Sequence, residues 1–122
     1  MKNITKHLLL ISSVTLLGAC TESNTELKSA KALYEVALTN SDQSTVKVAL
    51  NQLLLLDSNN TVYQDSLSRI YISSGNFAAG LRYAEKVFNA GKADVKLKEN
   101  MALAYQQIGK TDKAEQFVNS LK

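Results

Sequence analysis

The residues of this chain that could carry chemistry are few and unevenly placed. The sequence has one cysteine, Cys20, and one histidine, His7, so the chain after Cys20 has neither a thiol nor an imidazole. This composition argues against an intrachain disulfide, a His/Cys metal site and a histidine-activated nucleophile. Asp65 and Glu99 could form an acid/base pair, but no nucleophile or glycine-rich phosphate loop accompanies them. We therefore expect no enzyme activity, no metal and no cofactor.

The segment before Cys20 has the composition of a targeting signal. It starts with Lys2 and Lys6 and continues with an apolar run from Leu8 to Leu17. Ten helical residues rise about 15 Å, which is too short for a bilayer core of about 30 Å. A basic start, a short apolar core and small residues after it are typical of a secretory signal.

The end of this segment, Leu17-Gly18-Ala19-Cys20, resembles the bacterial lipobox. In lipoproteins with this motif the cysteine is acylated and becomes the first residue after cleavage. The resemblance implies removal of residues 1–19 and a lipid anchor on Cys20. Because Thr21 rather than aspartate follows, it also implies the outer membrane, facing the periplasm. The alternative is an ordinary signal peptide, or an uncleaved anchor, in which Cys20 is incidental.

The remainder of the chain contains an internal period of 34 residues. Three pairs of equivalent positions show it: Leu67 with Met101, Tyr71 with Tyr105, and Gly75 with Gly109. A fixed period of this length is the signature of a helical repeat array. The absence of proline and the low glycine content favour a mostly helical chain.

The stretch Leu53 to Asn60 (LLLLDSNN) is close to the end of the tetratricopeptide consensus, with Ser58 at the usual proline. The chain therefore resembles tetratricopeptide-repeat proteins over residues 27–122, with repeats at 27–60, 61–94 and 95–122. The resemblance implies an all-α fold of six antiparallel helices in a short right-handed solenoid. We expect helices near 27–40, 44–57, 61–74, 77–90, 95–108 and 111–121, after a polar, flexible tether at 20–26.

Repeat one departs from the pattern of the other two. Repeats two and three have small residues where their helices should cross, Ser68 with Gly80 and Ala102 with Ala114. Repeat one has Tyr34 and Val46 there, and Ala37 at the tyrosine position. An exchange of volume between Tyr34 and Ala37 would keep the core filled.

The turn and the second helix of repeat one are also unusual. Ser41 and Asp42 replace the glycine turn, and we expect Asn40 to take the tight conformation. The helix from Val46 to Leu56 is apolar on several faces and is expected to be covered on both sides. The last helix has one apolar stripe and is expected to cap the stack.

In tetratricopeptide arrays the first helix of each repeat lines a groove that binds peptides or protein segments. The groove residues that the resemblance implies are Lys31, Glu35, Asp65, Arg69, Ile72, Lys96, Glu99, Leu103 and Gln106. Arg69 lies in the central repeat, where we expect contact with a partner. The carboxylate clamp of chaperone-binding members is not expected, because Glu35 stands where an asparagine should donate a hydrogen bond.

The charge balance bears on the class of partner. Lys2 and Lys6 are two of the 14 basic residues, which leaves 12 after Cys20 against 11 acidic residues. A near-balance without a basic cluster argues against nucleic acid. We predict a lipid-anchored scaffold or adaptor that binds an envelope protein or peptide segment, in a pilus, secretion or outer-membrane machine. The alternatives are a self-associating structural lipoprotein and an inhibitor of a periplasmic enzyme.

Overall fold

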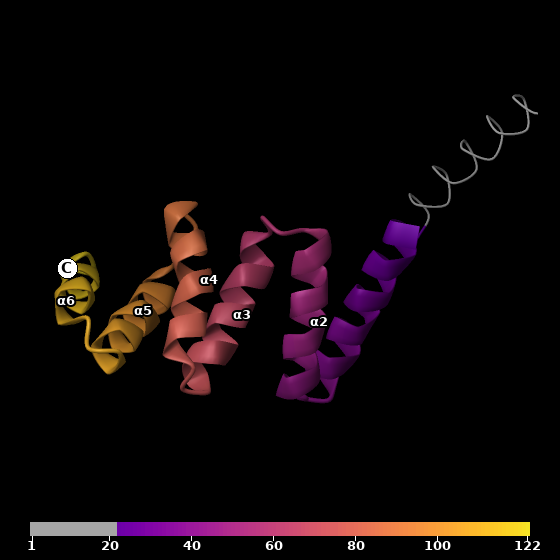
Figure 1. The fold of residues 1–122 in the computed structure, drawn as a ribbon, viewed down its shortest axis with the longest axis horizontal. Helices are drawn as coiled ribbons and strands as arrows, with labels where there is room; N and C mark the ends of the chain where they lie inside the picture. The colour runs from indigo at the N-terminus through magenta and orange to yellow at the C-terminus, as the bar shows by residue number, and fades with distance from the viewer. Residues whose placement is uncertain (1–21) are drawn as a thin grey trace, which may run out of the picture.

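The computed structural model describes residues 22–122 and consists of helices joined by short turns (Figure 1). The first helix covers residues 22–39. It is followed by α2 (Gln43–Leu56), α3 (Thr61–Ser73), α4 (Phe77–Asn89), α5 (Val95–Gln107) and α6 (Thr111–Asn119). No strand occurs between residues 22 and 122. The six helices form three adjacent pairs, which confirms the predicted all-α helical repeat array.

The helix boundaries agree with the predicted ranges to within two residues except at the start. Residues 22–26, expected in a flexible tether, are helical and continue into the first helix. This segment contains no glycine or proline, so nothing in it interrupts a helix that Leu27 and Ala30 hold in place by burial. The predictions for residues 1–19 and for Cys20 lie outside the described residues.

Side-chain caps set the starts of four helices. The Asn60 Oδ1 accepts the backbone N–H groups of Val62 and Tyr63 at 3.1 and 3.2 Å, where α3 begins. At the start of α4, the Asn76 Oδ1 accepts the N–H of Ala79 at 3.4 Å. Asp42 and Asp94 cap α2 and α5 in the same way.

The turn inside the first pair differs from the prediction by one residue. Ser41, not Asn40, has the positive φ of 55°. Gly75, at the equivalent position 34 residues later, has a φ of 84°. The repeat register therefore decides which residue takes the left-handed conformation, although Asn40 has the better intrinsic preference for it.

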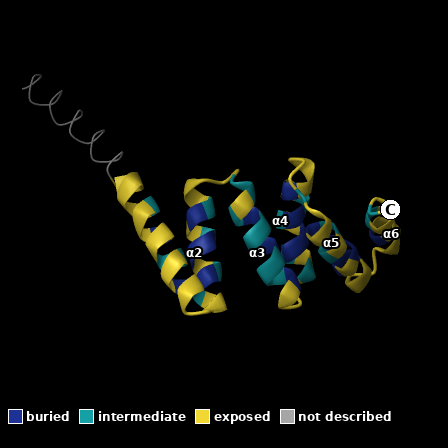
Figure 2. Cartoon of the chain, turned by 180° about the vertical axis from the view of Figure 1, so that it is seen from behind, coloured by how far each residue is buried: buried dark blue, intermediate teal, exposed yellow. Residues whose placement is uncertain are grey.

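Buried side chains line the facing sides of the helices in two groups (Figure 2). The larger group joins the last four helices and includes Leu81, Val87, Leu97 and Met101. The smaller group joins the first two pairs through Ala37, Val46, Leu50 and Leu67. Each pair thus buries its apolar side against the next one, as a repeat array requires.

The second pair crosses at small residues, as predicted. A Cβ added to Gly80 would lie 2.5 Å from Ile72 Cγ1 and 3.0 Å from the backbone oxygen of Ser68. Ser68 itself is fully buried. Farther along the two helices, Tyr71 and Tyr83 stack with ring centroids 6.0 Å apart. The two helices of this pair therefore approach closely where they cross, and the two tyrosine rings fill the space beside the crossing.

The third pair repeats this arrangement and the first pair reverses it. Tyr105 and Phe117, which are 34 residues after Tyr71 and Tyr83, also stack, at 5.6 Å. The equivalent residues of the first pair are Ala37 and Ala49, with exposed fractions of 2% and 0%. Two buried alanines stand where the other pairs stack rings, and Tyr34 packs against the same core group. This arrangement fits the predicted exchange of volume between Tyr34 and Ala37. Ala49 shows that the second helix of the pair, α2, also has a small residue at its stacking position.

The prediction that α2 is covered on both sides is confirmed, because α2 lies between the first helix and α3 and shares one core group with both (Figure 1). Leu55 is 85% exposed and Val48 is 49% exposed. The buried residues Val46, Leu50 and Leu53 all lie on the side of α2 that faces its neighbours. The exposure of Leu55 and Val48 shows that these two helices leave part of the surface of α2 uncovered.

Candidate protein-binding surface

The predicted groove residues lie on the first helix, α3 and α5 and differ in what surrounds them. Lys31 and Glu35 are exposed on the first helix and form no ion pair within residues 22–122. By contrast, α3 and α5 contact each other directly. The candidate surface is therefore the exposed side of α3 and α5, to which Lys31 and Glu35 contribute only from a separate helix.

Arg69 lies at the centre of this surface and is held by two carboxylates. Its Nε donates to both oxygens of Asp65 at 3.0 Å, one turn earlier in α3. Its Nη2 donates to the two oxygens of Asp94 at 2.9 and 3.1 Å. Asp94 Oδ1 also accepts the N–H of Leu97 at 2.7 Å, as the cap of α5. Arg69 thus links α3 to the start of α5.

The hydrogen bonds of this link stabilise the charged forms of Arg69 and Asp94. Partial burial of Arg69 opposes its charge, but the hydrogen bonds to Asp65 and Asp94 outweigh it and raise the pKa of Arg69. The N–H of Leu97 and then the Arg69 guanidinium lower the pKa of Asp94. Asp65 and Arg69 are each about one-third exposed. The geometry makes Arg69 a bridge between helices rather than a free cation for a partner.

Ile72 does not belong to the accessible surface. Its side chain is 6% exposed and packs in the larger core group. It faces Gly80, whose missing side chain leaves room for it. The family pattern places Ile72 on the groove helix, but the close crossing of α3 and α4 turns this position inward.

The accessible part of the surface is mixed in character. Lys96 Nζ lies 3.4 Å from Glu99 Oε2 in an exposed ion pair on α5. Leu103 is 48% exposed and Gln106 is exposed one turn farther along. Val62 on α3 is 68% exposed. Such a combination of charged, amide and aliphatic groups suits a polypeptide segment better than a small anion or a nucleic acid.

A second polar cluster lies between α4, α5 and α6 and was not predicted. The Tyr105 hydroxyl donates to the Glu85 carboxylate, and Lys113 Nζ lies 3.9 Å from Glu85 and 5.2 Å from the centroid of the Tyr105 ring. Burial and then Glu85 raise the pKa of Tyr105. Tyr105 is 3% exposed and belongs to the larger core group. The cluster joins the last two pairs.

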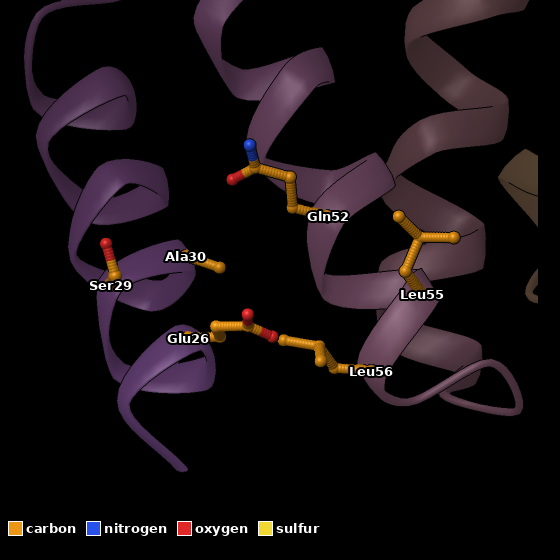
Figure 3. Close-up of a pocket in the computed structure, with 6 residues that line it drawn as sticks. All are labelled: Glu26, Ser29, Ala30, Gln52, Leu55 and Leu56. Atoms are coloured by element: carbon orange, nitrogen blue, oxygen red, sulfur yellow. The ribbon is translucent and has the colours of Figure 1, made fainter. Parts of the chain in front are cut away.

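A cleft between the first helix and the end of α2, with a mixed polar and apolar lining, was also missed. It has a volume of about 360 Å³ and is shown in Figure 3. Its lining residues are Glu26, Ser29, Ala30, Gln52, Leu55 and Leu56. The apolar run from Leu53 to Leu56, which ends α2, is the sequence signal that could have indicated this cleft.

Comparison with known proteins gives no relative on which to base a function. No protein-family model matches the chain, and no curated protein matches it. Within residues 22–122, none of the helices combines the length and apolar character needed to cross a bilayer.

Proposed function

We propose that the protein is an acylated lipoprotein of the bacterial outer membrane that uses a tetratricopeptide-like array to bind an envelope protein. The observation that carries the proposal is the surface of α3 and α5, on which Val62, Lys96, Glu99, Leu103 and Gln106 are exposed on a rigid stack of helix pairs. The equivalent ring stacking in the second and third pairs supports the repeat interpretation.

The mechanism combines anchoring with capture. Two or more acyl chains on Cys20 would hold the protein on the membrane, since each buried methylene contributes about 0.8 kcal/mol. A partner segment in the same compartment would then meet the α3 and α5 surface at a raised effective concentration. Assignment to a pilus, secretion or outer-membrane assembly machine rests on fold-level analogy, so the partner is defined here by its chemistry.

The anchor is tested by changing its only cysteine. We expect the unchanged chain to incorporate radiolabelled palmitate and to sediment with the outer membrane, and the Cys20→Ser chain to do neither. Uptake of palmitate by the Cys20→Ser chain, with retention in the membrane, would show that the anchor lies elsewhere.

The binding surface is tested by photo-crosslinking in cells from positions 103 and 106. Arg69 is less suitable, because its replacement would break the link to Asp65 and Asp94. Ala78, which is exposed on α4, serves as the matched control. A discrete partner trapped from Leu103 and Gln106 but not from Ala78 is the expected result. Equal labelling from all three positions would contradict the assigned surface.

Self-association is a second candidate, favoured by one observation. Val36 on the first helix and Val48 and Leu55 on α2 are 58%, 49% and 85% exposed. A second copy could cover these side chains. Sedimentation of the unacylated mature chain over a range of concentrations separates the two functions, because the adaptor is expected to remain monomeric. A dimer that Leu55→Ser dissolves would favour self-assembly.

A further inference from the structure

Three leucines gather where the first helix begins and α2 ends. Leu55 and Leu56 form the last turn of α2 and are 85% and 39% exposed. Leu56 also borders a hollow with Leu27, Ser23 and Asn24 of the first helix. We call Leu27, Leu55 and Leu56 the leucine end.

The position of the leucine end in the chain is informative. The described first helix begins at residue 22, two residues after Cys20. Two residues span at most about 7 Å, so anything attached to Cys20 starts close to this helix. In Figure 1 the first helix begins on the same upper edge on which α2 and α4 end. The end of α2, where Leu55 and Leu56 lie, and the start of the described part of the first helix are therefore on the same edge of the array.

We propose that the leucine end is a membrane-docking surface, which inserts Leu55 and Leu56 into the boundary between headgroups and acyl chains beside the anchor on Cys20. The inference rests on the proposed acylation and adds an orientation to it. With this edge on the bilayer, the array stands on the membrane at a fixed angle. The exposed residues of α3 and α5 are then held at a set height above the lipid.

A lipid surface suits the leucine end better than a second copy of the chain. A stable protein interface needs roughly 800 Å² from each partner. Two exposed leucines and a half-buried third supply only a small part of that area. A bilayer requires no matching shape, and acylation would place it within reach of these side chains.

The charges around the leucine end define the kind of lipid. Glu22, Glu26 and Asp57 are exposed near it. The basic residues near it are Lys28 on the first helix and Lys86, which lines a hollow with Leu55. Figure 3 shows Glu26 and Leu56 extending toward each other. A net negative rim repels anionic headgroups within about 8 to 10 Å at ordinary ionic strength. The surface therefore fits zwitterionic lipid, such as phosphatidylethanolamine.

The chain contains no tryptophan, so one substitution creates a single fluorescent reporter. Leu55→Trp is made in the full acylated protein, and Leu103→Trp is the matched control on α5. Each is placed in zwitterionic vesicles of phosphatidylethanolamine and phosphatidylcholine with brominated acyl chains. We expect Leu55→Trp emission to shift to shorter wavelength and to be quenched about twofold, as for an interfacial side chain. Leu103→Trp should be unaffected, and phosphatidylglycerol vesicles should reduce the quenching of Leu55→Trp.

The outcomes separate the two proposals. Acylated, membrane-bound protein whose Leu55→Trp reporter is quenched no more than Leu103→Trp would overturn the docking surface and leave the anchor intact. A concentration-dependent shift of the Leu55→Trp emission without quenching would show that a second copy covers the leucine end, and would also overturn it. A chain that takes up no acyl group would remove the anchor and the docking surface together.

Discussion

The second helix pair crosses at Ser68 and Gly80 and stacks Tyr71 on Tyr83, whereas the first pair places its bulk at the crossing positions. In the first pair, Tyr34 and Val46 occupy the crossing positions and two buried alanines occupy the stacking positions. Both pairs fill their interior. The difference shows that the repeat requires a constant volume between its helices, not a fixed place for the small residues.

The two pairs also differ in how much of them is covered. The second pair lies between the other two, while the first pair has a neighbour on one side within the described chain. In the first pair, Val48 and Leu55 of α2 are exposed although α2 lies between the first helix and α3. The central pair contributes core packing and the ion pairs of Arg69, which connect α3 to the start of α5. The first pair contributes exposed apolar side chains.

The largest effect is expected from removing the close crossing of the second pair. Gly80→Val brings side-chain atoms against Ile72 and the backbone of Ser68, where even a Cβ has no room. We expect a loss of about 3 kcal/mol in the free energy of unfolding, measured with urea. The control Ala78→Val, at an exposed site of α4, should change stability little. Equal stability of the two variants would refute the close crossing.

A smaller effect should follow from giving the first pair the aromatic residue of the second. Ala37→Tyr overfills a site that is 2% exposed, so we expect a loss of about 2 kcal/mol. Adding Tyr34→Ser should recover about 1 kcal/mol, because the two positions share one interior volume. Additive losses in a double-mutant cycle would mean that Tyr34 and Ala37 do not compensate each other.

The smallest effect concerns the ionic link, which the first pair lacks. Arg69→Glu reproduces the charge of Glu35 at the equivalent position and sets a third carboxylate beside Asp65 and Asp94. We expect a loss of about 1 kcal/mol in low salt, decreasing at high salt as the charges are screened. Glu35→Gln, the control on the first helix, should leave stability unchanged. A loss that is independent of salt would point to packing instead of charge.

Much of the fold was predictable because its signals are local. The 34-residue period, the caps and the glycine turns depend on residues near one another in the sequence, and five of the six helices begin and end within two residues of prediction. The role of the small residues Ser68 and Gly80 was also predictable, since the same positions recur one repeat later.

The candidate surface was less predictable, because exposure depends on neighbours in space. Ile72 and Arg69 both lie on the helix that the family pattern assigns to a groove. The crossing with α4 buries Ile72, and Asp94, 25 residues away in sequence, binds Arg69. The periodicity of α3 alone predicts neither the contact of Ile72 with α4 nor the hydrogen bonds between Arg69 and Asp94.

The sequence by itself determined the helices, their pairing and the polar caps at which they begin, since these follow from short-range preferences and a repeated apolar pattern. Only the tertiary structure decided which apolar residues remain uncovered and which charges are bound. Leu50 and Leu55 belong to the same apolar helix, yet one is fully buried and the other is 85% exposed. Both depend on which helices lie beside α2, and burial is a property of that arrangement.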